Sequence, residues 1–379
     1  MSAVDPKAIY VDENGDFSIR DDILHKVTAP NDVHIEVIYS GVNPADTKHA
    51  HLGIRSTVIG YDFCGRVLSV PSGSKLTKGD IVAGYTPSGM GRPSRYGTHQ
   101  AHCYCPEDMI FSVPSHLPQS HAAAITVVAM TAADTVFNIF KLPLPTSPAV
   151  HNCPIVIWGA SSSVGICALQ FLKASGCQNI LVTASLGRHE LLKSLGATHT
   201  FDYNSLTVEA DIAAAVQALG QGSVSHALDA AGTFTQPSSA DMLARAMNSP
   251  GAILASVTKF HGGFQMPLAT TKDEWRFLPP GAPEPISIPG NPERHWNAWT
   301  ALEWAIKQYN TRFMLPSVEI LDSTPEAALD EIIKVGNSGR GIWETSCSRQ
   351  PMKQMTVNYR LLVLPHVRFR SPIFGCESR

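Results

Sequence analysis

Residues 154–176, PIVIWGASSSVGICALQFLKASG, constrain the fold of this chain more than any other stretch. The run from Ile155 to Trp158 is apolar and mostly β-branched, as in a buried parallel strand, and Gly159 ends it. A turn of small residues follows, and apolar residues then recur at helical spacing as far as Gly176. Strand, tight turn and helix form the first half of a dinucleotide-binding unit, in which the helix N-terminus offers unpaired N–H groups to a pyrophosphate.

The turn differs from the pattern G-x-G-x-x-G, because only Gly159 and Gly165 remain and serines fill the middle. Serine restricts the backbone more than glycine does, but its hydroxyl can donate to a phosphate. We therefore expect the cofactor to contact the residues of this turn, which are Ser161, Ser162, Ser163 and Val164. The alternative is a structural strand-turn-helix unit that binds no ligand.

The end of the next predicted strand, residues 180–184, indicates which dinucleotide is bound. NAD enzymes carry an acidic residue about 20 positions further on, which binds the ribose 2′-hydroxyl. Here Ser185 stands at that offset from Gly165, where no Asp or Glu is found, and Leu186, Gly187 and Arg188 follow. A guanidinium can bind a 2′-phosphate through two hydrogen bonds, so the pattern favours NADP(H). The alternative is that Arg188 is a solvated residue at the start of a helix.

Composition excludes several classes of protein. The 379 residues allow two or three domains, and 44% hydrophobic with 16% charged residues is typical of a globular, core-rich chain. A net charge of -3 argues against nucleic acid or a membrane surface as the main partner. No basic-then-apolar signal pattern opens the chain, and no C-x-x-C pair occurs among the eight cysteines. We expect a cytoplasmic protein with reduced thiols.

The segments on either side of the central unit differ from it. Residues 1–120 contain short alternating runs broken by turn residues, which predict a barrel-like β module with strands at 33–39, 65–70 and 79–84. Residues 121–140 are alanine-rich and predict a helix pair. Residues 258–298 are irregular and rich in Pro and Gly, which leaves a substrate lid, an oligomer contact and a disordered insertion as alternatives.

Three further motifs, in this order along the chain, join the central unit in a resemblance. They are V-N-P-A-D at 42–46, G-Y-D-F-C-G-R-V at 60–67 and G-D-I-V at 79–82. With them the chain resembles the medium-chain dehydrogenase/reductase superfamily. The resemblance implies an α/β protein with a GroES-like β-rich catalytic domain over 1–120, completed by about 300–342, and a Rossmann NADP(H)-binding domain with a doubly wound parallel sheet over 121–299. Residues 343–379 form an atypical tail, either a gene-model artefact or a partner-binding arm.

Two departures from the superfamily pattern point to a zinc-free branch. Zinc alcohol dehydrogenases have G-H-E where this chain has Gly60, Tyr61 and Asp62, so the metal-binding histidine is absent. A structural zinc lobe needs four closely spaced cysteines, whereas Cys103 and Cys105 stand as an isolated C-x-C. The chain therefore looks like the quinone oxidoreductase and enoyl reductase branch, and we expect no metal.

Within that branch the chain most resembles trans-acting enoyl reductases of fungal polyketide biosynthesis. The segments I-W-G-A-S-S-S-V-G at 157–165, T-A-S-L-G-R-H at 183–189 and K-S-L-G-A-T-H-T-F-D-Y at 193–203 carry the resemblance, together with the long 258–298 segment. It implies NADPH-dependent reduction of an α,β-unsaturated thioester on a separate polyketide synthase, by a monomer or homodimer, in secondary metabolite biosynthesis. The alternatives are a stand-alone quinone or 2-enal reductase and a non-catalytic NADPH-binding protein.

The resemblance also implies the site residues. Lys48 and Thr131 are the catalytic candidates near the nicotinamide, although Lys48 has the alternative role of holding a phosphate or ribose. Tyr61 and Asp62 are possible substrate contacts, with turn capping the stronger alternative for Asp62. The implied substrate segment comprises Thr131, Ala132, Ala133, Asp134, Thr135, Val136, Phe137 and Asn138. The remaining implied cofactor contacts are Ala45, Asp46, Thr47, Lys48, Tyr203, Leu254, Ala255, Ser338 and Gly339.

Overall fold

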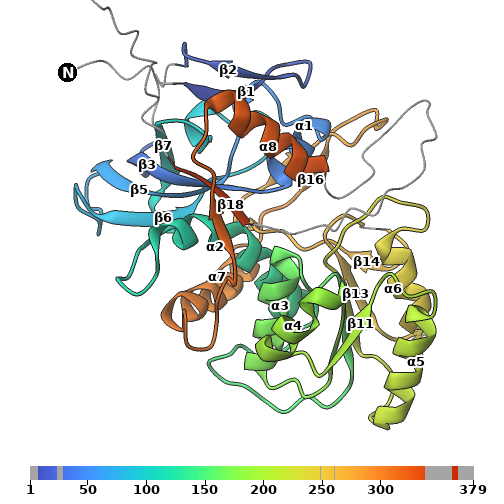
Figure 1. The fold of residues 1–379 in the computed structure, drawn as a ribbon. Coiled ribbons are helices and arrows are strands. Elements are labelled where there is room, and N and C mark those ends of the chain that lie inside the picture. The colour runs from blue at the N-terminus through green and yellow to red at the C-terminus, as the bar shows by residue number, and fades with distance from the viewer. Residues whose placement is uncertain (1–6, 24–28, 248, 260, 338–360, 366–379) are drawn as a thin grey trace, which may run out of the picture.

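The computed structural model describes residues 7–23, 29–247, 249–259, 261–337 and 361–365. A β-rich part and an α/β part lie side by side, joined through helix α2 (Figure 1). The predicted α/β class and two-domain architecture are therefore confirmed.

A seven-stranded sheet with the order β17-β18-β3-β5-β6-β8 forms the centre of the β-rich part, and β7 pairs with β3. In strand β3, Val33, Ile35 and Val37 are buried while the intervening residues are partly exposed, as the alternating sequence predicts. The strands are β3 (Asp32–Val42), β5 (Asp62–Ser69), β6 (Ile81–Tyr85), β7 (His102–Pro106), β8 (Ile110–Ser112), β17 (Val318–Ile320) and β18 (Leu361–Pro365).

A smaller sheet and two helices complete this part of the molecule. The three-stranded sheet has the order β2-β1-β4, and helix α1 packs against α8 (Figure 1). These elements are β1 (Ala8–Val11), β2 (Phe17–Arg20), β4 (Thr57–Val58), α1 (Ala45–His51) and α8 (Pro325–Asn337), with short 3-10 turns η1 (Ser94–Tyr96) and η2 (Glu107–Met109).

The α/β part contains a six-stranded sheet with the order β11-β10-β9-β12-β13-β14, and all its pairings are parallel. In β9, Ile155 and Ile157 face the core shared with α2 and α3, whereas Val156 and Trp158 face α5 and α6. Helices thus cover both faces, which explains the continuous apolar run. The elements are β9 (Ile155–Trp158), β10 (Ile180–Ala184), β11 (His199–Asp202), β12 (His226–Asp229), β13 (Ile253–Ser256), β14 (Phe264–Gln265), α3 (Ser163–Ser175), η4 (Leu186–Arg188), α4 (His189–Leu195), α5 (Val208–Leu219) and α6 (Ser239–Met247).

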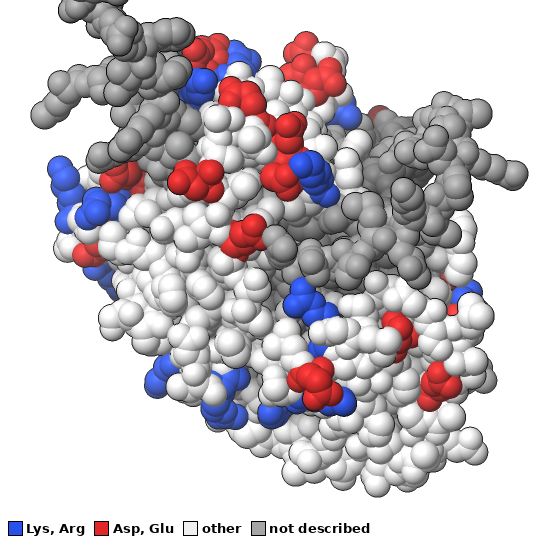
Figure 2. All heavy atoms as spheres, in the orientation of Figure 1, with Lys and Arg blue, Asp and Glu red and all other residues white. Residues whose placement is uncertain are grey.

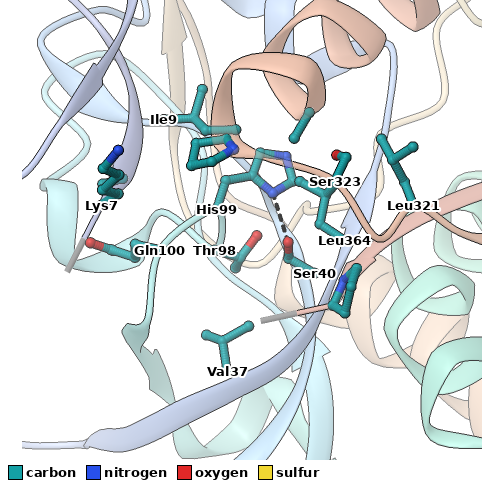
Figure 3. Close-up of a pocket in the computed structure, with 14 residues that line it drawn as sticks. Lys7, Ile9, Val37, Ser40, Thr98, His99, Gln100, Leu321, Ser323 and Leu364 are labelled. Atoms are coloured by element: carbon teal, nitrogen blue, oxygen red, sulfur yellow. Dashed lines mark hydrogen bonds between the residues drawn. The ribbon is translucent and has the colours of Figure 1, made fainter. Parts of the chain in front are cut away.

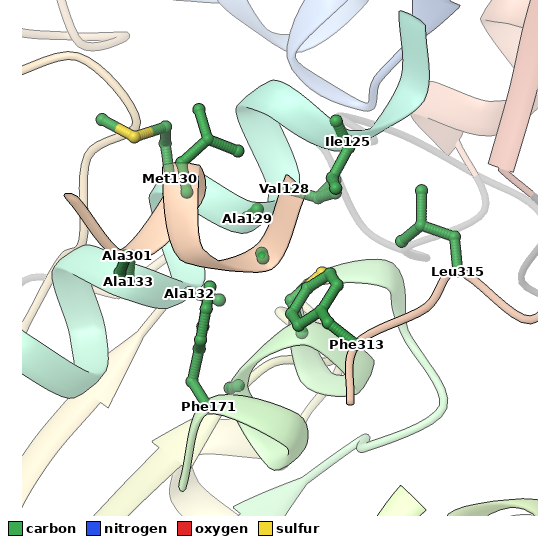
Figure 4. Close-up of a cluster of buried hydrophobic side chains, with 14 of the residues drawn as sticks. Ile125, Val128, Ala129, Met130, Ala132, Ala133, Phe171, Ala301, Phe313 and Leu315 are labelled. Atoms are coloured by element: carbon green, nitrogen blue, oxygen red, sulfur yellow. The ribbon is translucent and has the colours of Figure 1, made fainter. Parts of the chain in front are cut away.

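Helix α2 (Gln119–Ala133) continues directly into a π-helical turn, η3 (Asp134–Ile139), so the predicted helix pair is wrong. The combined helix is long and apolar enough to cross a membrane by composition alone, yet 83% of its most apolar window is buried inside the protein. Its alanines allow close approach to α3 and to α7 (Pro292–Lys307), around Phe171 and Phe313 (Figure 4). A helix buried on most sides carries no hydrophobic stripe from which its orientation could be read.

Two segments near the C-terminal end differ from expectation. Residues 361–365, in the predicted atypical tail, form β18, which pairs with β3 and β17 and so continues the catalytic-domain sheet. The rest of that tail lies outside the described residues. Within 258–298, residues Trp275–Phe277 (β15) and Ile286–Ile288 (β16) form an antiparallel hairpin, and α7 begins at Pro292. The described part of this segment therefore contains short regular elements, with irregular loops between them.

Candidate active site

A cavity of about 1190 Å³ lies between the β-rich part and the carboxyl edge of the parallel sheet. Helix α1, the ends of β6 and the middle of α2 line one side, and the turn before α3 and the loops after β12 and β13 line the other. Open parallel sheets bind ligands at this edge. The fold thus places the predicted phosphate-binding turn and the predicted catalytic segment around a single space.

The turn before α3 fits the pyrophosphate of a dinucleotide. Ser162 is the N-cap, because its Oγ accepts a hydrogen bond from the Gly165 N–H at 3.0 Å, and Ser162, Ser163 and Val164 all line the cavity. A Cβ added to Gly165 would lie 2.7 Å from the Gly159 carbonyl oxygen. Gly165 therefore allows the first turn of α3 to pack directly against the Gly159 backbone. The N-terminus of α3 then stays open to a ligand. Ser161 does not line the cavity among the described residues.

The residues predicted to bind the 2′-phosphate follow β10, next to β9 at the same edge of the sheet. Leu186 to Arg188 form the 3-10 turn η4, and Arg188 is half-buried. Tyr203, which follows β11, is 38% exposed. None of these residues lines the large cavity, so their contact with a cofactor remains a prediction.

Helix α1 presents one face to the cavity. Ala45, Lys48, His49 and Leu52 line it, at the spacing i, i+3, i+4 and i+7 of a single helical face. Lys48 was predicted from the sequence and His49 was not, although the same helical spacing identifies His49 once the helix is known. Burial lowers the pKa of Lys48, and its Nζ lies 5.8 Å from the centre of the Phe234 ring.

The other two α1 residues predicted to bind cofactor face away from this cavity. Asp46 accepts a hydrogen bond from the Asn43 N–H at 2.7 Å and lies 3.2 Å from His99 Nε2. His99 Nδ1 in turn lies 2.8 Å from Ser40 Oγ, beside a separate pocket of only about 50 Å³ (Figure 3). Thr47 is buried. Asp46 therefore joins α1 to His99 on the side away from the cavity, and neither Asp46 nor Thr47 lines the cavity. Their contact with a cofactor stays a prediction.

Only Thr131 of the predicted substrate segment lines the cavity. Its Oγ1 donates to the Val127 carbonyl oxygen at 2.8 Å, so its hydroxyl hydrogen is already used. The residues that follow Thr131 at the end of α2 and in η3 pack into the core, and most of them are fully buried. Residues 132–138 do not line this cavity, so their assignment to substrate contact stays a prediction that their position does not favour.

Asp134 instead joins elements that are distant in sequence. Its carboxylate forms a bidentate ion pair with Arg294 of α7 and accepts hydrogen bonds from Asn138 Nδ2 and from the Leu268 N–H, each at 2.9 Å. Leu268 lines the cavity, so this buried ion pair holds part of the cavity wall in place.

Asp62 and the strand β13 also differ from expectation. Asp62 is fully buried, and its two oxygens accept from Asn43 Nδ2 and from the Val127 N–H, each at 2.9 Å; burial raises its pKa to about 8. Asp62 thus connects β5 to α2 rather than contacting substrate or capping a turn.

Leu254 and Ala255 lie inside β13, away from the cavity, whereas Val257 and Thr258 beyond the strand line it. Ser338 and Gly339 lie outside the described residues.

Tyr61, His49 and Ser88 form a polar cluster on the side of the cavity that the β-rich part provides, and the sequence did not predict it. Tyr61 Oη is 2.6 Å from His49 Nδ1, which is also 3.3 Å from Ser88 Oγ, and all three residues line the cavity. Burial, reinforced by the charge of Arg92, lowers the pKa of His49 to about 3, so the imidazole is neutral at pH 7. Burial raises the pKa of Tyr61, an effect that Arg92 opposes.

Apolar side chains line the part of the cavity beside the β15–β16 hairpin. Trp275 and Phe277 stack with their ring centroids 4.3 Å apart, and Met266 and Leu268 adjoin them. The Trp275 ring also lies 5.9 Å from the ring of His49. The cavity thus has an apolar wall next to a small polar cluster, which is typical of sites for small organic ligands.

Within the described ranges, no group of three or more His, Cys, Asp or Glu side chains is arranged to hold a metal ion. Burial raises the pKa of the Cys103 and Cys105 thiols, and Cys105 donates to the Tyr85 carbonyl oxygen, so both are protonated core residues. Charged side chains of both signs are scattered over the described surface in Figure 2, with wide uncharged areas between them.

Comparison with known proteins gives two family matches and a group of similar sequences. The alcohol dehydrogenase GroES-like domain family matches residues 29–115, and the zinc-binding dehydrogenase family matches residues 163–267. The trans-enoyl reductase himH of Aspergillus japonicus is 33% identical over 194 residues, which cover 49% of this chain and 56% of that protein. The trans-enoyl reductase tazE of Aspergillus terreus is 34% identical over 203 residues, covering 50% and 65%. The chain spans less than two thirds of the length of these relatives.

Solved structures share the fold over nearly the whole chain. The CurK enoyl reductase superimposes with a TM-score of 0.65 at 17% identity, covering 95% of this chain and 99% of that one. The quinone oxidoreductase of Pseudomonas syringae gives a TM-score of 0.65 at 16% identity, with the same coverage. At such identities the likeness concerns the fold alone. The chain therefore has the medium-chain dehydrogenase/reductase fold with both of its characteristic domains, and in sequence it resembles the enoyl reductases of that superfamily.

Proposed function

We propose that the chain is an NADPH-dependent, zinc-independent enoyl reductase that acts in trans on an α,β-unsaturated acyl thioester carried by a polyketide synthase. The observation that carries the proposal is the single cavity that joins the N-terminus of α3 to the apolar wall around Trp275. A phosphate-binding end and an acyl-binding end in one space are what a hydride transfer to a conjugated thioester requires. The similarity to proteins named trans-enoyl reductases supports this choice of substrate class.

The residues around the cavity have separate tasks in this proposal. Ser162, Ser163 and the backbone N–H groups at the start of α3 would hold the pyrophosphate, and Arg188 with Ser185 would distinguish NADPH from NADH. A bound nicotinamide would supply the hydride. Trp275 and Phe277 would bind the apolar part of the acyl chain and exclude water from the double bond.

Zinc independence is supported by the residues at the positions where zinc enzymes bind metal. Tyr61 stands where those enzymes have histidine, and its phenol hydrogen-bonds to His49. In the part of the chain that the structure describes, no group of three or more His, Cys, Asp or Glu side chains is arranged to hold a metal ion. Polarisation of the thioester carbonyl would therefore depend on hydrogen-bond donors of the protein.

The test is NADPH oxidation at 340 nm with an α,β-unsaturated acyl thioester, presented both on pantetheine and on an acyl carrier protein, with NADH in parallel. We expect turnover with NADPH and much weaker turnover with NADH. Arg188→Gln should weaken NADPH binding by about tenfold or more and leave NADH binding unchanged, because only NADPH carries the 2′-phosphate. Lys193→Gln, one turn further along α4 in a surface ion pair with Glu190, is the matched control.

Three results would contradict the proposal. Reduction of quinones without any reduction of thioesters would identify a stand-alone quinone reductase. NADPH binding with no reduction of either substrate would identify a non-catalytic binding protein. Equal turnover with NADH and NADPH would refute the assignment of Arg188.

A further inference from the structure

Arg92 is a buried cation, only 6% exposed, that forms no ion pair with an Asp or Glu in the described part of the chain. Its guanidinium instead donates to neutral acceptors, namely the carbonyl oxygens of Pro87, Val58, Gly60 and Tyr96 and the hydroxyl of Thr86. Burying a charge that is held mainly by neutral acceptors is costly, and the charge of Asp46 offsets part of that cost.

The guanidinium lies over the ring of Tyr61. Its central carbon is 4.5 Å from the ring centroid, within the range of a cation–π interaction. A fixed positive charge at this distance stabilises negative charge on the phenol more than it stabilises the neutral phenol. Arg92 therefore lowers the cost of removing a proton from Tyr61. Burial and the negative charge of Asp46 act in the opposite direction and keep the phenol protonated at neutral pH.

His49 provides the second contact to the Tyr61 oxygen. Its Nδ1 lies 2.6 Å from Tyr61 Oη, and the imidazole is neutral because burial and Arg92 keep its pKa near 3. With the ring proton on Nδ1, the imidazole donates to the phenol oxygen, and the phenol hydrogen is left for a group in the cavity. The same N–H would stabilise a phenolate once that hydrogen is given away.

We propose that Tyr61 is the catalytic residue that donates the proton to the α-carbon of the reduced substrate, with Arg92 and His49 as positioning residues that stabilise its phenolate. This inference rests on the proposed enoyl reductase function. Addition of hydride at the β-carbon moves the double-bond electrons to the α-carbon and the thioester carbonyl. The α-carbon–hydrogen bond then forms as the Tyr61 O–H bond breaks, and the phenolate regains a proton from water as product leaves.

The two donors expected from sequence are less suited to this task. The hydroxyl hydrogen of Thr131 is held by the Val127 carbonyl oxygen. Lys48 lies beside the Phe234 ring, and nothing described in the structure orients its ammonium toward the polar cluster. Tyr61 combines a position on the cavity, a free hydrogen in one imidazole tautomer, and two groups that stabilise its conjugate base.

The test uses an α-methyl enoyl pantetheine thioester, whose reduction creates a stereocentre at the α-carbon. Tyr61→Phe should lower kcat by about 10²–10⁴-fold, the usual contribution of a general acid. The product that still forms should have mixed α-configuration, because water then protonates the enolate from both faces, while the wild type gives one configuration. NADPH affinity, measured by fluorescence titration, should not change.

Tyr85→Phe is the matched control. Tyr85 is a second buried tyrosine on the same cavity, but its hydroxyl donates to the Ala269 carbonyl oxygen at 2.8 Å. This variant should keep a single α-configuration. Lys48→Met and Thr131→Val test the rival donors, and each should also keep one configuration.

The outcomes separate this inference from the proposed function. A wild-type protein that reduces no thioester refutes the function and the inference together. A wild type that reduces thioesters, with a Tyr61→Phe variant of equal rate and unchanged α-configuration, refutes the inference alone. Loss of configuration in Lys48→Met or Thr131→Val, but not in Tyr61→Phe, would assign the proton to that residue instead.

Discussion

Replacement of Arg294 by Met should show how much the buried Asp134–Arg294 ion pair contributes to the stability of the protein. The side chain of Asp134 is 1% exposed and that of Arg294 is 30% exposed. The variant removes two charge-assisted hydrogen bonds, worth about 1.5–3 kcal/mol each, and leaves a buried carboxylate with only the Asn138 and Leu268 donors. Breaking a buried pair costs about 3–5 kcal/mol, and access of water from the Arg294 side favours the lower end. We expect a loss of about 3 kcal/mol in the free energy of unfolding.

Urea unfolding, followed by tryptophan fluorescence and by far-UV circular dichroism, measures this loss. The matched control is Arg245→Met, which removes a similar bidentate pair with Glu209 on the surface, where the two side chains are 50% and 34% exposed. That variant should cost less than about 1 kcal/mol. The double variant Asp134→Asn/Arg294→Met should be less destabilised than the sum of the single variants, because the amide carries no unpaired charge. An Arg294→Met loss no larger than that of Arg245→Met would refute the reasoning.

Three further predictions follow from the cavity and its surroundings. Gly165→Ala should raise the NADPH dissociation constant by about tenfold or more in a fluorescence titration, because the added Cβ would lie 2.7 Å from the Gly159 carbonyl oxygen. Gly251→Ala is the control, because a Cβ added there meets open space. Equal affinities of the two variants would contradict the close approach at Gly165. The folded pKa of His49, about 3, lies below its unfolded value of 6.5, so its contribution to stability is complete above pH 6.5 and is lost as the pH falls toward 3. Between pH 7 and pH 5 this loss is roughly 2 kcal/mol, and His49→Gln should remove that part of the pH dependence in urea unfolding; an unchanged pH profile would mean that the imidazole is not held neutral. Trp275→Leu should enlarge the space beside the apolar wall, because Leu is smaller than Trp. The ratio of kcat/KM for long against short acyl thioesters should then shift by about tenfold toward long chains, and a profile like that of the wild type would place the acyl chain elsewhere.

Local patterns in the sequence determined the elements that recognise a dinucleotide. The apolar run before Gly159, the serine N-cap and the glycine after the helix each act within a few residues, so the strand, turn and helix at 155–176 were predictable. The alternation in residues 33–39 likewise predicted a half-buried strand. Order and spacing of four motifs then indicated the two-domain architecture.

Tertiary structure decided which of the expected residues share the cavity. Helix α2 is buried on most sides and has no distinct apolar stripe, so its orientation could not be read from the sequence. The sequence therefore did not reveal that only Thr131 of the 131–138 segment faces the site, or that Asp134 pairs with Arg294, 160 positions away. The contact between Tyr61 and His49 depends on how β5 is placed against α1.

The same distinction applies to the last strand. Leu361–Pro365 is apolar, but its partner β3 lies more than 300 residues earlier, so only the folded sheet assigns it to the catalytic domain. Hydrogen bonds and packing between residues a few positions apart depend only on the local sequence, so the sequence alone determined the strands, turns and helix ends that they form. Contacts between distant segments depend on how whole elements pack, and the composition of the site was therefore decided by the tertiary structure.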